Sequence, residues 1–264
     1  MRTLALAGAL LAIAAAAGRS AIAQPAAPLP GQPLPSGQPL PQADPELLFA
    51  GDFDTCDLSQ WPHRQDGGRQ DIAAVSSPLA TPGSGCSGRF NTGRGDQIGD
   101  TSPRNELYRP RDAVCCNEGD ERWIRWQVRL DRDWRYGSPD AFSTILQFKS
   151  DDASPGQMSF ILFGDRLALR RGDERWSTRL TRGRWHDFLL HVVFSARARR
   201  GRARLWHDGR RQSVNGGRRF ATLANRRGAY LKLGLYRSAS LPRASLHHDG
   251  LRMGLTRRSV TRGA

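Results

Sequence analysis

Lysine is almost absent from this chain of 264 residues. Only Lys149 and Lys232 are lysines among 40 basic residues, so the remaining 38 are arginines, against 25 acidic residues and a formal charge of +15. A general bias toward arginine accounts for most of this composition, but it does not explain where the two lysines stand. The charge predicts an acidic partner: a nucleic acid, an anionic membrane surface or a polyanionic glycan.

Long hydrophobic runs are missing as well. The apolar stretch at residues 4–17 is shorter than the about 20 residues that cross a bilayer, and no later stretch qualifies. Because it follows Arg2 and precedes the small residues Ala21 and Ala23, it predicts a secretory signal peptide over residues 1–23. Its removal, with Arg2 and Arg19, lowers the charge to +13. We therefore expect a secreted protein, periplasmic or extracellular, with no transmembrane segment and no nucleic-acid partner.

Proline is concentrated in one place. Residues 24–45 hold eight of the sixteen prolines, and Gly-Gln-Pro-Leu-Pro occurs at 31–35 and again at 37–41. Such a segment forms an extended spacer and has no means of building a core. We therefore predict a linker over residues 24–46 and one folded domain over residues 47–264.

Cysteine is scarce, and its four copies all fall in the first half of the domain: Cys56, Cys86, Cys115 and Cys116. Disulfides suit an exported protein. A bond between the adjacent Cys115 and Cys116 would be strained, so we expect each of them to pair with Cys56 or Cys86. No C-x-x-C spacing supports zinc binding instead.

Helical periodicity is hard to find after residue 47, whereas short alternating runs are common. Strands are predicted at residues 123–130, 143–150, 158–163, 166–171, 185–194, 203–207, 230–236 and 250–255. Many short strands without interleaved helices predict an all-β domain, an antiparallel β-sandwich or jelly roll.

Alternation also predicts which side chains share a face of the sheet, because successive side chains of a strand point to opposite sides. In 230–236 the leucines form one row, whereas Tyr230, Lys232 and Tyr236 form the other. In 145–149, Gln147 and Lys149 lie together, and Arg104 and Glu106 do so in 104–107. Such rows are usually solvated, but three rows that hold both lysines favour a functional face.

Three segments carry a resemblance to a known group of enzymes: Ser102-Pro103-Arg104-Asn105-Glu106-Leu107, Ile145-Leu146-Gln147-Phe148-Lys149 and Tyr230-Leu231-Lys232-Leu233-Gly234-Leu235-Tyr236. They resemble the R-x-E-L, Q-x-H and Y-x-K-x-G-x-Y strands of the secreted jelly-roll polysaccharide lyases, which include alginate lyases, heparin lyase I-like and glucuronan lyases. The resemblance covers roughly residues 47–255 and implies a jelly roll of the concanavalin A-like kind. One departure is Lys149, which stands where the alginate lyases have histidine.

The resemblance implies roles for these positions. Tyr236 would be the catalytic acid and also the base, while Arg104 and Gln147 would neutralise the uronate carboxylate. Lys149 is a second candidate for the base, which leaves the identity of the base open. Four further residues are candidates for substrate binding: Glu106, Lys232, Tyr230 and Arg237.

The chemistry gives independent reasons for these residue types. β-Elimination of a 1,4-linked uronate removes the C5 proton, which is barely acidic beside a charged carboxylate. An arginine binds such a carboxylate bidentately and stabilises the charge that develops on it. A tyrosine can remove the proton when nearby cations stabilise its phenolate, because its ordinary pKa is about 10.

Other sites have less support in the sequence. A glycoside hydrolase needs two carboxylates at a suitable separation, and the cluster Glu118, Asp120 and Glu121 falls in an expected loop. The histidine spacings, such as His186 with His191, predict no metal site and no required cofactor. A structural Ca²⁺ at Asp52, Asp54 and Asp249 is conceivable. The arginine run at 197–204 is either a patch that captures anionic chains or a solvated hairpin.

Two functions follow as hypotheses. The first is a secreted lyase, a monomer, that cleaves a uronate-containing polysaccharide such as glucuronan, alginate or a heparin-like chain. The second is a non-catalytic, lectin-like module that binds anionic glycans through its arginines. A screen for unsaturated uronate products distinguishes the two.

Overall fold

The structure is a computed structural model that describes residues 44–66, 71–76, 84–98, 101–112, 114–138, 140–150 and 157–262. The predicted signal peptide and nearly all of the predicted linker therefore lie outside the described residues. From Ala43 onward the chain forms one compact unit. Among the described residues, no helix is long and apolar enough to span a bilayer.

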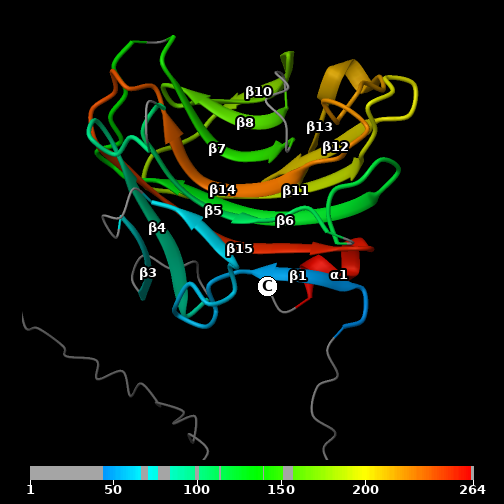
Figure 1. Ribbon diagram of the computed structural model, residues 1–264, viewed down its shortest axis with the longest axis horizontal. Coiled ribbons are helices and arrows are strands. Elements are labelled where there is room, and N and C mark those ends of the chain that lie inside the picture. The colour runs from blue at the N-terminus through cyan, green and yellow to red at the C-terminus, as the bar shows by residue number, and fades with distance from the viewer. Residues whose placement is uncertain are drawn as a thin grey trace, which may run out of the picture. The chain divides into compact units, whose positions relative to one another are not determined.

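Two antiparallel sheets face each other, and their curved strands cross most of the domain (Figure 1). The first sheet has eight strands, in the order β13 (Arg210–Gln212), β12 (Arg202–His207), β11 (Trp185–Val193), β6 (Glu121–Leu130), β15 (Ala244–Gly254), β4 (Cys86–Thr92) and β3 (Ile72–Ser76), with β1 (Leu47–Gly51) also paired to β15. The second has seven, in the order β10 (Asp173–Arg179), β9 (Arg166–Arg171), β8 (Met158–Phe163), β7 (Phe142–Lys149), β14 (Tyr230–Arg237), β5 (Arg104–Arg109) and β2 (His63–Gln65). The described helices are short: η1 (Val214–Gly217) and α1 (Arg257–Thr261), which lies beside β15. The predicted antiparallel jelly roll is confirmed.

The core lies between the two sheets and is rich in aromatic rings. Trp126 of β6 stacks on Phe188 of β11 at 5.1 Å and meets Phe160 of β8 edge-on at 4.8 Å, so rings from both sheets interlock. Along β6, every second residue is buried. Burial of such large apolar surfaces is the main force that holds the two sheets together.

The apolar rows of the second sheet lie where alternation predicts them. Leu231, Leu233 and Leu235 of β14 are fully buried against the first sheet, and Leu146 and Phe148 of β7 are at most 2% exposed. The alternate residues of these strands must then point away from the first sheet. This outward face of β5, β7 and β14 carries the side chains that the sequence singles out.

The pairing of the cysteines differs from the expected one. Cys56 and Cys86 form a disulfide with a Cα–Cα distance of 5.2 Å, and Cys115 and Cys116 are bonded to each other. The expectation that Cys115 and Cys116 reach back to the other pair is wrong. Cys116 exchanges two backbone hydrogen bonds with Ala229, at 2.9 and 3.0 Å, which fixes this loop beside the start of β14.

A histidine joins the two sheets through the core. His248 of β15 is fully buried, and its Nε2 lies 3.1 Å from the carbonyl oxygen of Gly234 on β14. Gly234 has no room for a Cβ, which would clash with the backbone of Asn105 and Glu106 on β5. The contact therefore supports β14 at a point where its backbone lies very close to β5.

This contact makes stability depend on pH. Burial, reinforced by the charge of His247, lowers the pKa of His248 from 6.5 to about 4. Because the unfolded state takes up the proton near pH 6.5 and the folded state only near 4, stability is lost as the pH falls between these values, by about 3 kcal/mol in total. Urea unfolding from pH 7.5 to 4 measures this loss. We expect His248→Gln, which keeps an N–H donor but does not titrate, to flatten this part of the profile.

Candidate active site

A buried ion pair forms the floor of the outward face. Lys232 Nζ on β14 contacts Glu106 Oε2 on β5, and the two side chains are only 3% and 2% exposed. Lys232 Nζ also donates to Gln65 Oε1 on β2 at 2.6 Å, and Gln147 Nε2 on β7 donates to Glu106 Oε1 at 2.6 Å. One network therefore links four adjacent strands, as buried charges require.

The ion pair lies between two further cations. Burial lowers the pKa of the Lys232 ammonium, and the charges of Arg104 and Lys149 lower it further, against the opposing effect of Glu106. Arg104 belongs to β5 and Lys149 to β7, the two strands that flank β14. The outward face thus brings three cations, Arg104, Lys149 and Lys232, near the carboxylate of Glu106.

Arg104 and Tyr236 form a stacked pair on this face. They are register partners on β5 and β14, and the guanidinium carbon lies 4.1 Å from the centroid of the tyrosine ring. Phe142 packs edge-on against the same ring at 5.1 Å. Within the described part of the chain, neither the phenol oxygen nor the terminal guanidinium nitrogens have a protein partner, since Arg104 donates only through Nε, to Ser102 O at 3.5 Å. Both groups are therefore available to a ligand.

Lys149 lies at the opposite end of the outward face from Tyr236. Its register partner on β14 is Tyr230, six residues from Tyr236, which corresponds to roughly 20 Å along a strand. The sequence rightly groups Lys149 with Gln147 and Lys232, but the register does not place it beside Tyr236. Of the two candidate bases, Tyr236 is the one in contact with Arg104.

Aromatic side chains line the Lys149 end of the face. Tyr230 and Tyr108 lie edge-to-face at 6.0 Å and, with Pro110 and Arg111, line a hollow of about 280 Å³. His63 of β2 stacks on Tyr108 at 4.9 Å. Such rings offer flat apolar surfaces, and Lys149 is the register partner of Tyr230. Sequence reasoning missed Tyr108 in this hollow, although it continues the alternating row of Arg104 and Glu106.

Arg237 lies apart from these residues. Its side chain is fully buried, it donates to the carbonyl oxygens of Thr92 and Pro242 at 3.2 and 2.5 Å, and it lies 4.8 Å from the Trp134 ring. Burial lowers the pKa of its guanidinium to about 10. In this arrangement Arg237 holds loops to the end of β14 and has no access to a substrate, so we leave it out of the site.

The acidic cluster that the sequence offered for hydrolysis serves the fold. Glu118 accepts hydrogen bonds from Ser195 Oγ at 2.6 Å and from the Ala196 amide at 2.7 Å. Asp120 pairs with Arg122 at 3.1 Å, and Glu121 Oε1 lies 2.6 Å from His191 Nε2. These carboxylates therefore position loops and strands of the first sheet.

The acidic residues considered for Ca²⁺ have a cation already. Arg252 of β15 contacts Asp52 at 2.9 Å and Asp54 at 3.3 Å, and Asp52 also accepts from Gln60 at 2.7 Å. Asp249 is buried. The guanidinium supplies the positive charge that an ion at this place would have brought.

Comparison with known sequences decides the family. The sequence profile of the family described as "Polysaccharide lyase" matches residues 53–252, which is most of the chain and both sheets. The chain belongs to the polysaccharide lyase family. This confirms the resemblance to the polysaccharide lyases and supports a polysaccharide-degrading function. No curated protein matches the sequence.

Solved structures agree with this lyase fold. The endo-β-1,4-glucuronan lyase of Trichoderma reesei matches with a TM-score of 0.59 at 15% identity, over 77% of this chain and 94% of its own. The GH131 β-glucanase catalytic domain of Podospora anserina has the same TM-score and identity, over 80% and 96%. The alginate lyase Aly36B matches with a TM-score of 0.52 at 11% identity, over 75% and 89%. At such identities these likenesses describe the fold alone, and it serves lyases and a glucanase alike.

Proposed function

We propose that this polysaccharide lyase cleaves a uronate-containing anionic polysaccharide by β-elimination, with Tyr236 and Arg104 at the reacting sugar. The observation that carries the proposal is their contact: the guanidinium carbon of Arg104 lies 4.1 Å from the centroid of the Tyr236 ring. Among the described residues, neither the terminal guanidinium nitrogens nor the tyrosine hydroxyl has a partner. A carboxylate held by Arg104 places the adjacent C5 next to that hydroxyl.

In the proposed reaction Tyr236 acts first as base and then as acid. The phenolate oxygen takes the C5 proton, and the electrons of the C5–H bond form a C4–C5 double bond as the C4–O bond breaks. The protonated tyrosine then returns the proton to the leaving oxygen, so that one residue serves both steps. The products are a new reducing-end half and a half that begins with an unsaturated uronate.

Arg104 stabilises the charge on the path to these products. Removal of the C5 proton adds negative charge to a carboxylate that is already charged, and a fixed guanidinium meets this charge without reorganisation. The same guanidinium faces the Tyr236 ring, so charge on the phenol oxygen also lies near a cation. Arginine suits this place because its planar fork matches a carboxylate.

Gln147 takes a different part from the one that the resemblance implies. Its amide nitrogen donates to Glu106, and its Oε1 lies 3.4 Å from the Gln157 amide nitrogen. We assign it a positioning role, in which Gln147 and Glu106 hold the Lys232 ammonium below the substrate. Lys232 and Lys149 then bind carboxylates of neighbouring sugars, and Tyr230 stacks on a sugar ring at that end.

A panel of polysaccharides tests the proposal. Glucuronan, alginate and heparin-type chains are incubated with the full chain, and the absorbance of unsaturated uronate is followed with time. We expect a rise with at least one uronate polymer and none with neutral β-glucan. Salt-sensitive retention of the polymers in affinity electrophoresis without any product would favour the lectin-like alternative. Products without an unsaturated end would indicate a hydrolase.

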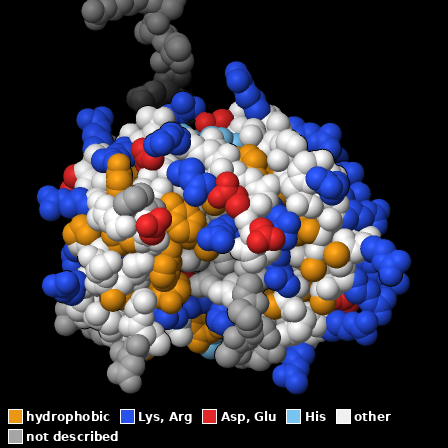
Figure 2. Space-filling model, turned by 90° about the horizontal axis from the view of Figure 1, so that it is seen from above, with side chains coloured by type: hydrophobic (Ala, Val, Ile, Leu, Met, Phe, Trp, Pro, Cys, Tyr) orange, Lys and Arg blue, Asp and Glu red, His pale blue; other side chains and the backbone are white. Residues whose placement is uncertain are grey.

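Arginines gather on one side of the domain. Figure 2 shows them along the side on which Figure 1 places β12 and β13. Arg197, Arg199 and Arg200 are exposed, line a hollow of about 650 Å³, and form no ion pair within the described ranges. Burial of the Glu118 carboxylate opposes ionisation, but hydrogen bonds and the charges of Arg197 and Arg226 outweigh it and lower its pKa. Arg226 lies four residues before Tyr230, which connects this patch to the Tyr230 end of the site.

We expect this arginine patch to capture long chains. Replacing Arg197, Arg199 and Arg200 together with glutamine removes three exposed charges, each worth about 0.5 kcal/mol in polymer binding. The KM for polymer should rise roughly tenfold, with kcat and the KM for short oligosaccharides unchanged. Kinetics at low and high salt measure this, because screening should erase the difference.

A matched control separates local capture from net charge. Arg132, Arg179 and Arg182 are exposed near the opposite end of β11, so their joint replacement with glutamine changes the charge equally elsewhere. This control should keep the KM of the parent protein. Equal rises in both variants would show that bulk charge, and not this patch, attracts the polymer.

Export is the remaining part of the proposal. The Cys56–Cys86 disulfide is typical of proteins from oxidising compartments, and residues 1–23 have the composition of a signal peptide. A polysaccharide too large to enter a cell also has to be cleaved outside the cytoplasm. Amino-terminal sequencing of the exported protein should give Gln24 as its first residue.

A further inference from the structure

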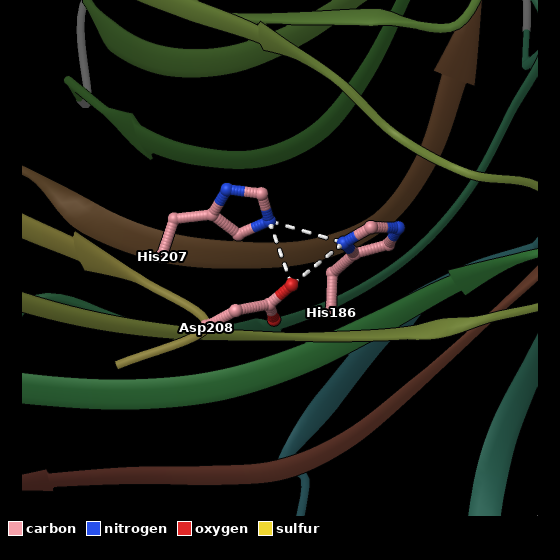
Figure 3. Close-up of side chains that lie close together, drawn as sticks. All are labelled: His186, His207 and Asp208. Carbon is pink, nitrogen blue, oxygen red and sulfur yellow. Dashed lines mark hydrogen bonds and ion pairs between the residues drawn. The ribbon is translucent and has the colours of Figure 1, made fainter. Parts of the chain in front are cut away.

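Two histidines and an aspartate meet at one end of β11 and β12, in the first sheet. His186 Nδ1 and His207 Nε2 are 3.0 Å apart, and Asp208 Oδ2 lies 3.4 Å from the first and 3.5 Å from the second. Figure 3 shows the three donor atoms converging on one point between the residues. Tetrahedral zinc with bonds of about 2.0–2.1 Å holds its ligand atoms about 3.3 Å apart. The three separations match that value.

Each of the three donors is oriented by a contact behind it. The His207 ring stacks on Phe188 at 4.7 Å with an interplanar angle of 7°. On the far side of His186, Nε2 lies 2.9 Å from the Thr181 amide nitrogen and 3.2 Å from the Thr181 carbonyl oxygen, and these contacts hold the ring in place. Asp208 Oδ1 accepts from the Asp187 amide at 2.9 Å, which leaves Oδ2 turned to the histidines. Support behind the ligand is typical of metal sites, and here it fixes the orientation of the two rings and of the carboxylate.

We propose that His186, His207 and Asp208 bind a divalent transition-metal ion of the zinc type. Two imidazole nitrogens and one carboxylate oxygen suit Zn²⁺, whereas Ca²⁺ and Mg²⁺ prefer sets made of oxygen alone. The His186 side chain is 3% exposed and that of Asp208 29%, so the ion enters from the Asp208 side. A water molecule there completes four ligands.

Three contacts of the metal-free protein must change when the ion binds. The hydrogen bond between His186 Nδ1 and His207 Nε2, which are 3.0 Å apart, is lost, because both nitrogens must turn a lone pair to the ion. The Thr181 amide lies 2.9 Å from His186 Nε2 and donates to it, so this nitrogen has to take a proton and donate to the Thr181 carbonyl instead. Arg184 Nη2 pairs with Asp208 Oδ2 at 3.0 Å and competes with the ion for this oxygen. Because Arg184 is largely exposed, it can swing away at little cost.

The site is distinct from the lyase residues. Its ligands belong to β11, β12 and the turn after β12 in the first sheet, whereas Tyr236 and Arg104 lie on the second. Thr181 stands in the connection from β10 to β11, where the chain passes from the second sheet to the first. A bound ion would therefore clamp this connection to the β11–β12 hairpin, and we expect it to raise the unfolding temperature without entering the reaction.

Titration with zinc tests the site. The full chain is stripped with a chelator and titrated with Zn²⁺ against a chromophoric zinc indicator, and Co²⁺ serves as a probe whose visible absorption reports four-coordinate geometry. We expect one ion per chain. His207→Gln and Asp208→Asn should each weaken binding at least about 100-fold, since loss of a ligand exceeds the loss of its supporting contacts. Asparagine is chosen because Asp208 has a positive φ of 48°, which asparagine tolerates.

Two further variants complete the test. His191→Gln removes a histidine of the same strand that contacts Glu121 instead, and it should bind zinc as the parent protein does. Arg184→Gln removes the competing cation and should tighten binding, by up to about fivefold. The proposal is overturned if the parent binds no stoichiometric zinc. It also fails if the His207 and Asp208 variants, folded by circular dichroism, bind zinc as tightly as His191→Gln.

Discussion

Tyr236→Phe is expected to abolish lyase turnover while leaving polymer binding almost unchanged. The substitution removes only the hydroxyl, so the ring still stacks on Arg104 and packs against Phe142. If the phenol oxygen carries the proton from C5 to the leaving oxygen, its loss should lower kcat on the order of 10³-fold. The rate of unsaturated uronate formation and affinity electrophoresis on the same polymer measure the two effects separately.

Tyr136→Phe is the matched control for this prediction. Tyr136 is also a tyrosine with a stacked arginine, Arg182, at 5.2 Å, but it is 43% exposed and lies before β7, away from the network of Lys232. It should keep full activity. Retention of activity by Tyr236→Phe would remove Tyr236 from the mechanism, and equal losses of binding and turnover would make it a substrate-binding residue.

The strands could be predicted from the sequence where local alternation decides them. Residues 158–163 and 166–171 are strands with the predicted bounds, because a turn at Gly164 and Asp165 separates two clear runs. The rows of β14 were predictable as well, since three alternating leucines define one face. The strands β1, β2, β3, β4, β10 and β13 were not predicted. Their sequences do not alternate clearly between apolar and polar residues, so pairing with neighbours decides their conformation.

Which residues of the site meet depends on register, and local sequence does not determine register. In the regular pairing of β7 and β14, Lys149 faces Tyr230, and a bulge between Leu233 and Tyr236 then makes Thr144 the partner of Tyr236. Gln65, which contacts Lys232, comes from a three-residue strand that carries no motif. Likewise, His207 meets His186 only because β11 and β12 pair side by side, which spacing along the chain does not reveal.

Burial of the polar row is the part that sequence reasoning describes least well. Alternation assigns Glu106, Gln147 and Lys232 to a polar face, which is usually solvated, yet each is at most 3% exposed. Four strands bring complementary groups together here, so that the buried groups are paired with one another. A buried charge is tolerated only when it is paired and hydrogen-bonded, so these residues support one another, and none of them can be understood from its own strand.

This mutual dependence predicts a large effect on stability. Lys232→Met keeps most of the side-chain volume but leaves the Glu106 carboxylate buried beside the amide of Gln147 without its cation. Breaking one partner of a buried ion pair typically costs about 3–5 kcal/mol, so urea unfolding at pH 7 should show a loss of that size. The double variant Lys232→Met/Glu106→Gln removes both charges and keeps an acceptor for Gln147, and it should recover more than half of the loss.

The double variant also separates the structural role of Lys232 from its role in the reaction. If the ammonium serves only to neutralise Glu106, the double variant, in which both side chains are neutral, should recover activity along with stability. If it also holds the carboxylate of the sugar next to the one bound by Arg104, stability returns but kcat/KM on the uronate polymer stays low. The expected deficit is about 100-fold, because a lost charge-assisted contact costs about 3 kcal/mol. We expect the second result. We expect it because burial and the repulsion from Arg104 and Lys149 lower the pKa of Lys232. An anionic substrate bound to these three cations would relieve their mutual repulsion.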